Sequence, residues 1–242
     1  MDAQTLIFIT ALSVGGTFFF GGALKRHFRH LVSDHAEAAA AGTVEREMSV
    51  IDQRRKSVIQ GFIEETSRPA GDSRQDLKVC RLLTHSDHQD CLENAFRTAQ
   101  NRIVIISPQL SVWAIKGSGI DAQIYDAVSR GITVSVFTDD QLNRDQEGSP
   151  RRAAVLGKKL LEDAGAVVFI AHGIHQKTLI IDDQAIADGS YNWLSAVRDR
   201  NHAHHREERT NMITGGEASA NIKRELERLV RLVPLAQRVK AA

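Results

Sequence analysis

The stretch that decides the fold is His175-Gln-Lys-Thr-Leu-Ile-Ile-Asp182, followed by Asp-Gln-Ala-Ile-Ala-Asp and then Gly189-Ser-Tyr-Asn-Trp193. Apolar runs at residues 177–182 and 185–188, separated by a polar turn, predict two strands of a hairpin. Strand geometry projects the side chains of His175 and Lys177, two positions apart, from one face. The returning strand then delivers the Ser190 hydroxyl and the Asn192 amide to the same end of the hairpin.

This combination of side chains favours an anionic ligand. An imidazole beside a fixed ammonium gains nothing structurally, because the cation would only lower the pKa of His175. A shared anion explains the pairing. A nucleophile, a cation and two neutral donors that converge on one point suit the oxygens of a phosphoryl transition state.

The spacing resembles the signature of the phospholipase D superfamily: H-x-K, four residues, D, six residues, then G-S-x-N. The resemblance covers about residues 77–232, including Ser107-Pro108 and the apolar run 131–139. It implies a phospholipase D-like domain, a mixed sheet flanked by helices. Every signature position is occupied here, by His175, Lys177, Asp182, Gly189, Ser190 and Asn192.

The resemblance also implies a role for each residue. His175 would attack phosphorus and form a phosphohistidine, while Lys177, Ser190 and Asn192 would hold the non-bridging oxygens. No metal and no other cofactor is required. Asp182 has the opposite strand parity to His175, so we interpret it as structural, fixing the hairpin and the lysine.

The family uses a downstream acidic residue to orient the nucleophilic histidine, as an aspartate does in a serine triad. Glu208 is our candidate, with Glu207 as the alternative, and a solvated surface glutamate is the simpler interpretation of both. In this family a second motif normally protonates the leaving group, and the chain holds one motif. The resemblance therefore implies a homodimer in which two copies of His175 face each other.

The rest of the chain alternates strand-like and helix-like segments, which indicates an α/β layered domain. Expected strands are residues 78–83, 102–107, 132–138, 166–171, 177–182, 185–188 and 210–214, and expected helices are 87–100, 120–129, 151–164 and one closing the chain.

The N-terminal region has a different composition. Residues 6–24 are uncharged and long enough, at about 19 residues, to span a bilayer as a helix. Basic residues follow at 25, 26 and 29, which predicts a single-pass membrane protein with a cytoplasmic catalytic domain. A buried core hairpin is the alternative. The predicted organisation is an anchor at 1–32, a helical spacer and linker at 33–76, and the catalytic domain at 77–242.

Within the spacer, apolar residues 44, 48, 51, 58 and 62 form a heptad-like seam, compatible with a coiled coil or a solvated helix. The run Cys80, His85, His88 and Cys91 could be considered for zinc, but core packing explains it better. Trp113 and Trp193 are expected to be packing residues rather than platforms on which bases stack. The net charge of +1 excludes a global polycation, so nucleic acid binding would need a local basic surface.

Three functions follow from these patterns. The first is an endonuclease-like hydrolase of nucleic acid, which the single motif and the histidine- and arginine-rich run at 199–206 favour. The second is a phospholipase D or phosphatidyltransferase acting on membrane phospholipid, which the predicted anchor favours. The third is a non-catalytic tethered binding module, against which the intact signature argues.

Overall fold

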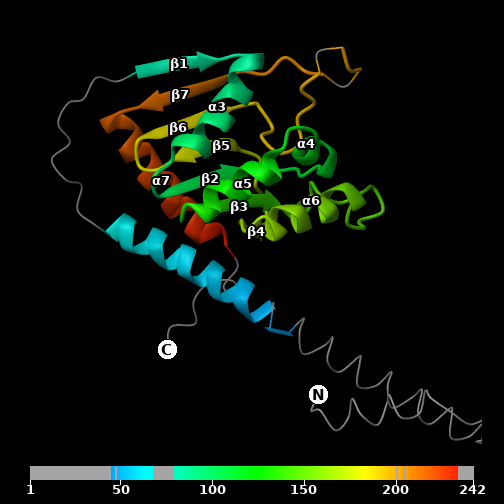
Figure 1. Cartoon of the computed structure of the whole chain (residues 1–242), viewed down its shortest axis with the longest axis horizontal. Coiled ribbons are helices and arrows are strands. Elements are labelled where there is room, and N and C mark those ends of the chain that lie inside the picture. Colours follow the sequence, from blue (N-terminus) through cyan, green and yellow to red (C-terminus); the bar gives the residue numbers. More distant parts are fainter. Residues whose placement is uncertain (1–44, 47, 68–78, 200, 204, 234–242) are drawn as a thin grey trace, which may run out of the picture. The chain divides into compact units, whose positions relative to one another are not determined.

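A seven-stranded mixed sheet forms the centre of the protein (Figure 1). The computed structural model describes residues 45–46, 48–67, 79–199, 201–203 and 205–233. The strand order is β1-β7-β6-β5-β2-β3-β4. The strands are β1 (Val79–Leu83), β2 (Arg102–Ile106), β3 (Thr133–Asp139), β4 (Val167–Ala171), β5 (Lys177–Ile181), β6 (Ala185–Gly189) and β7 (Thr210–Thr214).

The parallel half of the sheet is β2-β3-β4, and the remaining neighbours pair antiparallel. Helical crossovers connect the parallel strands, as parallel pairing requires. The helices are α3 (His85–Thr98), α4 (Val112–Gly117), α5 (Ile120–Ser129), α6 (Arg152–Asp163) and α7 (Gly216–Leu232). The mixed sheet with flanking helices confirms the predicted α/β class.

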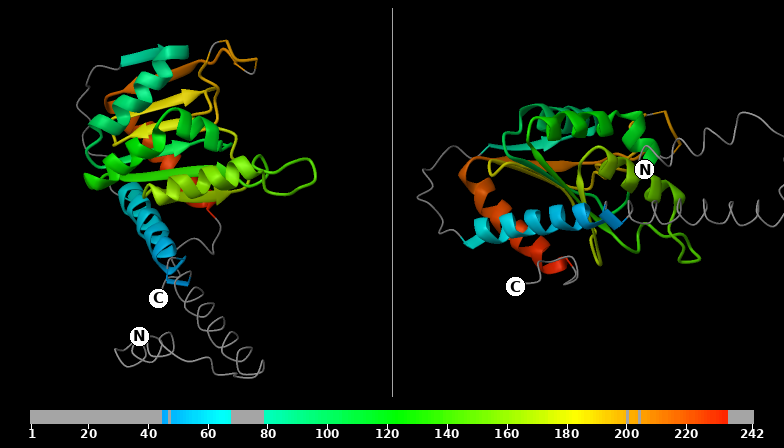
Figure 2. Two further views of the ribbon diagram at one scale, coloured as in Figure 1. Left: turned by 45° about the vertical axis from the view of Figure 1, so that its right-hand side comes forward. Right: turned by 60° about the horizontal axis from the view of Figure 1, so that its bottom comes forward.

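Two hydrophobic cores lie on opposite faces of the sheet because successive side chains of a strand alternate between faces. In β2, Ile103 and Ile105 join one core, whereas Val104 and Ile106 join the other. Helices α3, α4, α5 and α6 cover the first face, and α7 covers the second (Figure 2). All four of these β2 residues are fully buried, which explains why this strand is an unbroken apolar run.

Helical residues 50–67 pack on the second face, together with α7. Ile59 and Phe62 are buried in that core. Arg55 donates to the carbonyl of Val168 in the edge strand β4 (2.9 Å) and pairs with Glu162 (3.1 Å). The helix therefore blocks part of an edge that could otherwise pair with another strand. Contacts within the chain divide it into residues 1–49 and 50–242.

The prediction of a single-pass membrane location, with a cytoplasmic catalytic domain, is wrong for the described part of the chain. No helix there is long and apolar enough to cross a bilayer. Its 17-residue helix α7, for example, alternates buried apolar with charged positions along its length. Residues 6–24, on which the anchor was predicted, lie outside the described residues, as does the linker at 68–76.

The β6–β7 contact depends on a glycine. A Cβ atom at Gly189 would lie 2.3 Å from the carbonyl oxygen of Arg209 and 2.5 Å from the Thr210 Cα. We expect Gly189→Ala to lower the free energy of unfolding by about 1–3 kcal/mol, since backbone must move to make room.

The measurement is urea denaturation, with Gly61→Ala as the matched control. A Cβ at Gly61, in the helix at residues 50–67, would meet nothing within 4 Å. That variant should unfold at the same or a higher urea concentration, because alanine favours a helix over glycine. Equal midpoints for the two variants would contradict the steric explanation.

Candidate active site

Strand register brings the candidate residues together where β5 begins, β6 ends and β7 begins. This row of strand ends forms one edge of the sheet. Lys177 is paired with Gly189, and Gly189 with Thr210, across β5, β6 and β7. Because these strands are antiparallel, the start of β5, the end of β6 and the start of β7 meet at this edge. His175 and Lys177 therefore lie on the same edge as Ser190 and Glu208.

The histidine and the lysine share a short exposed turn before β5. His175 is exposed and Lys177 is half-buried. The Lys177 ammonium donates to the His175 carbonyl oxygen (2.8 Å). No carboxylate pairs with Lys177 among the described residues, so its charge is available to an anion.

A buried carboxylate fixes the turn that carries His175. Asp139, at the end of β3, is 3% exposed, and its Oδ2 accepts from the backbone N–H of Ile174 (2.9 Å). Its Oδ1 accepts from the N–H groups of Gln141 and Leu142 (both 2.8 Å). Asp139 thus ties the residue before His175 to the core of the sheet.

Ser190 is fixed by reciprocal contacts with the segment before β7. Its N–H donates to the Arg209 carbonyl (2.9 Å), and its hydroxyl oxygen accepts from the Arg209 N–H (3.1 Å). The hydroxyl of this exposed residue also donates to the Arg209 carbonyl (3.3 Å). Ser190 and the Glu208–Arg209 segment are consequently positioned as one unit.

Asn192 presents an amide whose hydrogen-bonding groups are unused. Its backbone carbonyl accepts from the N–H groups of Ser195 and Ala196, which fixes the turn. Its side-chain amide has no partner in the described part of the chain, and Oδ1 is buried. Because Oδ1 can only accept, the Nδ2 amino group is the part of Asn192 that can donate to a phosphoryl oxygen.

A stack of buried rings supports the backbone on both sides of Asn192. Tyr191 stacks on the imidazole of His88 with ring centroids 4.1 Å apart, and Trp193 meets the same ring edge-on at 5.8 Å. The His88 Nε2 atom lies 2.8 Å from the Thr210 hydroxyl. His88, which is completely buried, therefore connects the Asn192 segment to the start of β7.

Asp182 lies at the other end of β5. Five strand residues separate it from the edge that holds Lys177, about 16 Å of extended chain. Its carboxylate accepts from the N–H groups of Gln100, Asn101 and Arg102 (3.1, 2.8 and 3.0 Å). Asp182 thus fixes the hairpin to the turn before β2, but the predicted contact with the lysine is not formed.

The two glutamates before β7 differ in exposure. Glu208 is half-buried, whereas the side chain of Glu207 is 84% exposed and lies 3.7 Å from His205 Nε2. Neither forms a hydrogen bond with His175. The orienting role of Glu208 remains a prediction.

The amino-acid sequence matches the sequence model of a known protein family. The sequence model of a family described as "Cardiolipin synthase, PLD-like domain" matches residues 92–230, more than half of the chain. The chain belongs to the phospholipase D superfamily.

Several solved structures are similar to this chain. The phospholipase D family member Nuc from Salmonella typhimurium has a TM-score of 0.50 at 13% identity, covering 65% of this chain and 97% of Nuc. NucT from Helicobacter pylori has a TM-score of 0.47 at 18% identity, covering 65% and 98%. Phosphatidylserine synthase from Haemophilus influenzae has a TM-score of 0.47 at 15% identity, covering 65% and 39%. A comparison with curated protein sequences found no match.

Three residues of this phospholipase D-like site were missed by sequence reasoning: His88, Asp139 and His172. The exposed ring of His172, between β4 and His175, has Nδ1 3.1 Å from the Asp140 carboxylate. Partial burial acts to raise the pKa of Asp140, but hydrogen bonds from His172 and Gln141 outweigh it and lower the pKa. An aspartate pair directly after a buried strand was the available signal for Asp139 and Asp140.

The cysteine–histidine run is not assembled into a metal site. No cluster of three metal-ligating side chains occurs in the described part of the chain. His88 is committed to the ring stack, and the Cys91 thiol lies 3.9 Å from the Met212 sulfur. Burial raises the pKa of the Cys91 thiol to about 11, so this cysteine is poorly suited to act as a thiolate ligand.

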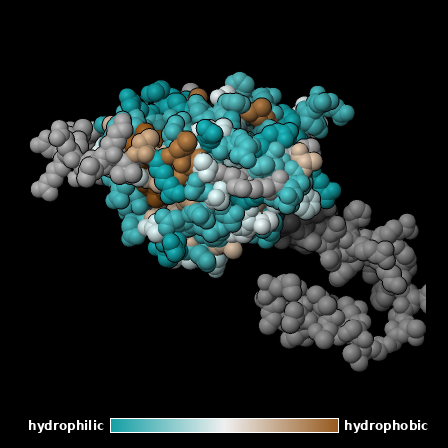
Figure 3. Space-filling model, turned by 90° about the horizontal axis from the view of Figure 1, so that it is seen from above, coloured by the Kyte–Doolittle hydropathy of each residue, from teal (hydrophilic) through white to brown (hydrophobic). Residues whose placement is uncertain are grey.

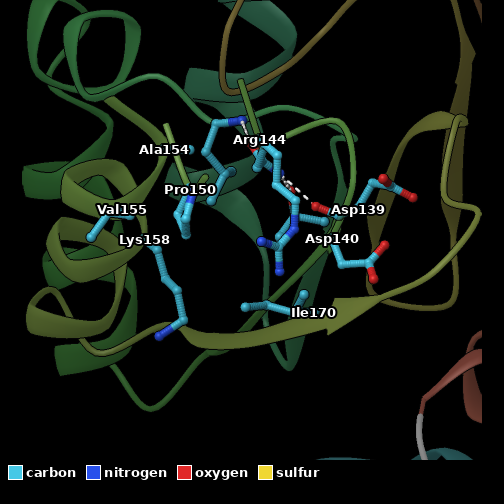
Figure 4. A pocket seen from close by; sticks show the side chains of 11 residues that line it. Asp139, Asp140, Arg144, Pro150, Ala154, Val155, Lys158 and Ile170 are labelled. Atoms are coloured by element: carbon cyan, nitrogen blue, oxygen red, sulfur yellow. Dashed lines mark hydrogen bonds between the residues drawn. The ribbon is translucent and has the colours of Figure 1, made fainter. Parts of the chain in front are cut away.

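An open hollow lies beside the same edge, between α6, β4 and the loop after β3 (Figure 4). Arg144 and Lys158 line it, together with apolar side chains of Val155 and Ile170. Lys158 pairs with Glu162 (2.6 Å), and Arg144 donates to the Gly148 carbonyl (2.7 Å). Lys158 is thus paired with a carboxylate, whereas Arg144 and Lys177 each donate to a backbone carbonyl.

We expect Asp182→Ala to destabilise the fold by about 1.5–3 kcal/mol, because three backbone N–H groups lose a charged acceptor. Thermal or urea unfolding of the full-length chain measures the change. Asp183→Ala is the control, since its neighbouring side chain is exposed and should change stability by less than about 0.5 kcal/mol. Equal stability of both variants would show that the Asp182 contacts contribute nothing.

Proposed function

We propose that the protein is a metal-independent phosphodiesterase that acts through a phosphohistidine at His175, with nucleic acid as its substrate. One observation carries the proposal: the strand register gathers His175, Lys177 and Ser190 at one edge, with Asn192 just beyond β6. The unpaired ammonium and the unused amide are the donors that a phosphoryl oxygen requires.

The proposed first step forms a bond between an imidazole nitrogen of His175 and phosphorus, and breaks the bond to the leaving oxygen. Lys177, Ser190 and Asn192 stabilise the non-bridging oxygens as negative charge accumulates. The leaving oxygen takes a proton from the imidazole of a second copy's His175. Water, activated by that same second imidazole, then attacks phosphorus and releases the phosphomonoester. Glu208 would fix the tautomer of the nucleophile.

Nucleic acid is favoured by exposed cations beside the site. Arg206 and Arg209 precede β7, and no carboxylate pairs with either guanidinium among the described residues. Exposed cations near a site can contact the phosphates of a polymer. The alternative is phosphatidyl transfer or phospholipid hydrolysis, which the family's description as a cardiolipin synthase domain supports.

We expect Lys177→Ala and His175→Ala to lower cleavage of an oligonucleotide in EDTA by at least about a thousandfold. The assay follows a labelled oligonucleotide on a gel, beside phosphatidylglycerol vesicles. The matched control is Lys159→Ala, which removes an exposed lysine paired with Asp163 on α6 and should leave the rate unchanged. A strict need for added metal would contradict the mechanism, and cleavage of lipid alone would favour the alternative.

The second proposal is that two copies of the chain complete the site, which predicts dominant inhibition. Mixing wild-type protein with an excess of the His175→Ala variant should lower activity per wild-type chain in proportion to the wild-type fraction. The readout is cleavage rate against mixing ratio after subunit exchange, with mass measured by light scattering. A monomeric, fully active protein, or an activity indifferent to mixing, would show that one histidine is enough.

A further inference from the structure

Trp113 is the most exposed large hydrophobic side chain in the described part of the chain. It is 78% exposed, whereas Trp193 is completely buried. The sequence-based expectation that both tryptophans pack in the core is therefore correct for Trp193 and wrong for Trp113. Single exposed apolar residues are common on protein surfaces, so exposure alone does not indicate a binding role for Trp113. Its location relative to the site has to supply the evidence.

Trp113 lies on α4, which is attached to the segment that carries Asn192. The N–H of Ser111, two residues before Trp113, donates to the Leu194 carbonyl (3.0 Å). Arg198 donates to the carbonyl of Ala114, the residue after Trp113 (3.4 Å), and to the Tyr191 hydroxyl (3.1 Å). The backbone before and after Trp113 is therefore hydrogen-bonded to the segment that carries Asn192.

Helix α4, which carries Trp113, is packed closely against the rest of the protein. Ile115 is fully buried, and the Ser111 hydroxyl caps α4. Helix α6 approaches closely through Gly157, where a Cβ would lie 3.2 Å from the Val112 nitrogen and from Ile115 Cδ1. The exposed indole therefore stands on a fixed support. Helix α4 lies at the end of the sheet that holds the site (Figure 1).

The surroundings favour a ligand that combines flat rings with phosphates. Arg206 and Arg209 are exposed, in the loop between Arg198 and β7. A lipid bilayer or a protein partner would need a broader apolar surface. Among the residues of α4, all of which are described, Trp113 is the only exposed large hydrophobic side chain. Figure 3 shows one face of the protein, seen from above, that is mostly hydrophilic with hydrophobic residues in small separate groups.

We propose that Trp113 is a stacking platform for an unpaired base of a single-stranded nucleic acid whose phosphate lies at His175. The inference rests on the proposed function and narrows it to single strands. Bases in a duplex already stack on their neighbours, so their faces are closed to the indole. Stacking on an aromatic side chain is tolerant of sequence, since every base has a π-face.

The chain's two tryptophans allow a direct test. Full-length His175→Ala protein, which should not cleave its ligand, is titrated with a single-stranded oligonucleotide while tryptophan emission is recorded. We expect quenching of Trp113, and we expect it to disappear in His175→Ala with Trp113→Phe, because the remaining Trp193 is buried. A duplex of the same sequence should quench far less.

Affinity for a labelled single strand gives the second measurement. Trp113→Ala should weaken binding by about 5- to 100-fold, and Trp113→Phe by less. The control is Tyr125→Ala, which removes another exposed aromatic side chain, 62% exposed on α5, and should leave affinity unchanged. Unchanged affinity of Trp113→Ala would overturn the proposal.

Two other outcomes would also overturn it. A blue shift of Trp113 emission on phosphatidylglycerol vesicles, without quenching by oligonucleotide, would place the indole in a lipid surface. A change of mass in Trp113→Ala alone would place it between protein copies. If His175→Ala quenches with oligonucleotide but the wild type never cleaves it, stacking is supported and the proposed enzyme activity fails. Cleavage by the wild type without quenching in His175→Ala would support the enzyme activity and overturn the stacking.

Discussion

The close approach of β6 to β7 at Gly189 is the constraint on which the site depends. Arg209 and Thr210 leave no room for a side chain there, so only glycine permits the observed register. A slip of one residue in a strand turns every side chain to the opposite face. The register Lys177–Gly189–Thr210 then determines which residues reach the edge and which remain in the core.

Buried polar contacts hold the segments that carry the exposed residues of the site. Asp139 fixes the turn before His175, and the His88 ring joins Tyr191 to Thr210. In the same way the buried Ser107 hydroxyl accepts from the Leu194 N–H (3.3 Å). Buried hydrogen bonds of this kind are costly to break, because each lost partner leaves a desolvated group behind. The segments are therefore fixed without a carboxylate partner for Lys177 among the described residues, which leaves its charge open to an anion.

The sequence was sufficient for the features that depend on short-range pattern. The seven strands and the hairpin of His175 and Asp182 follow from alternating and continuous apolar runs. Helix α4 was missed because six residues are too few to show helical periodicity. Its exposed Trp113 was consequently assigned to the core.

Long-range contacts were beyond sequence reasoning. Nothing in the spacing of residues 80–91 indicates that His88 stacks on Tyr191 and meets Trp193 edge-on, more than a hundred residues later. The same limit applies to Asp182, whose parity indicated a structural role but not its partners at residues 100–102.

Charge distribution explains why local contacts must carry recognition. The chain has 31 basic and 30 acidic side chains, so its long-range field attracts a polyanion weakly. Many cations are neutralised where they serve the fold, as Arg102 is by Glu65 and Arg55 by Glu162. Lys177 and Arg209, at the edge of the sheet, are not. The proposed ligand would therefore be captured at short range, where its phosphate would meet the Lys177 ammonium, which pairs with no carboxylate among the described residues, and Trp113 would add contact area without adding charge.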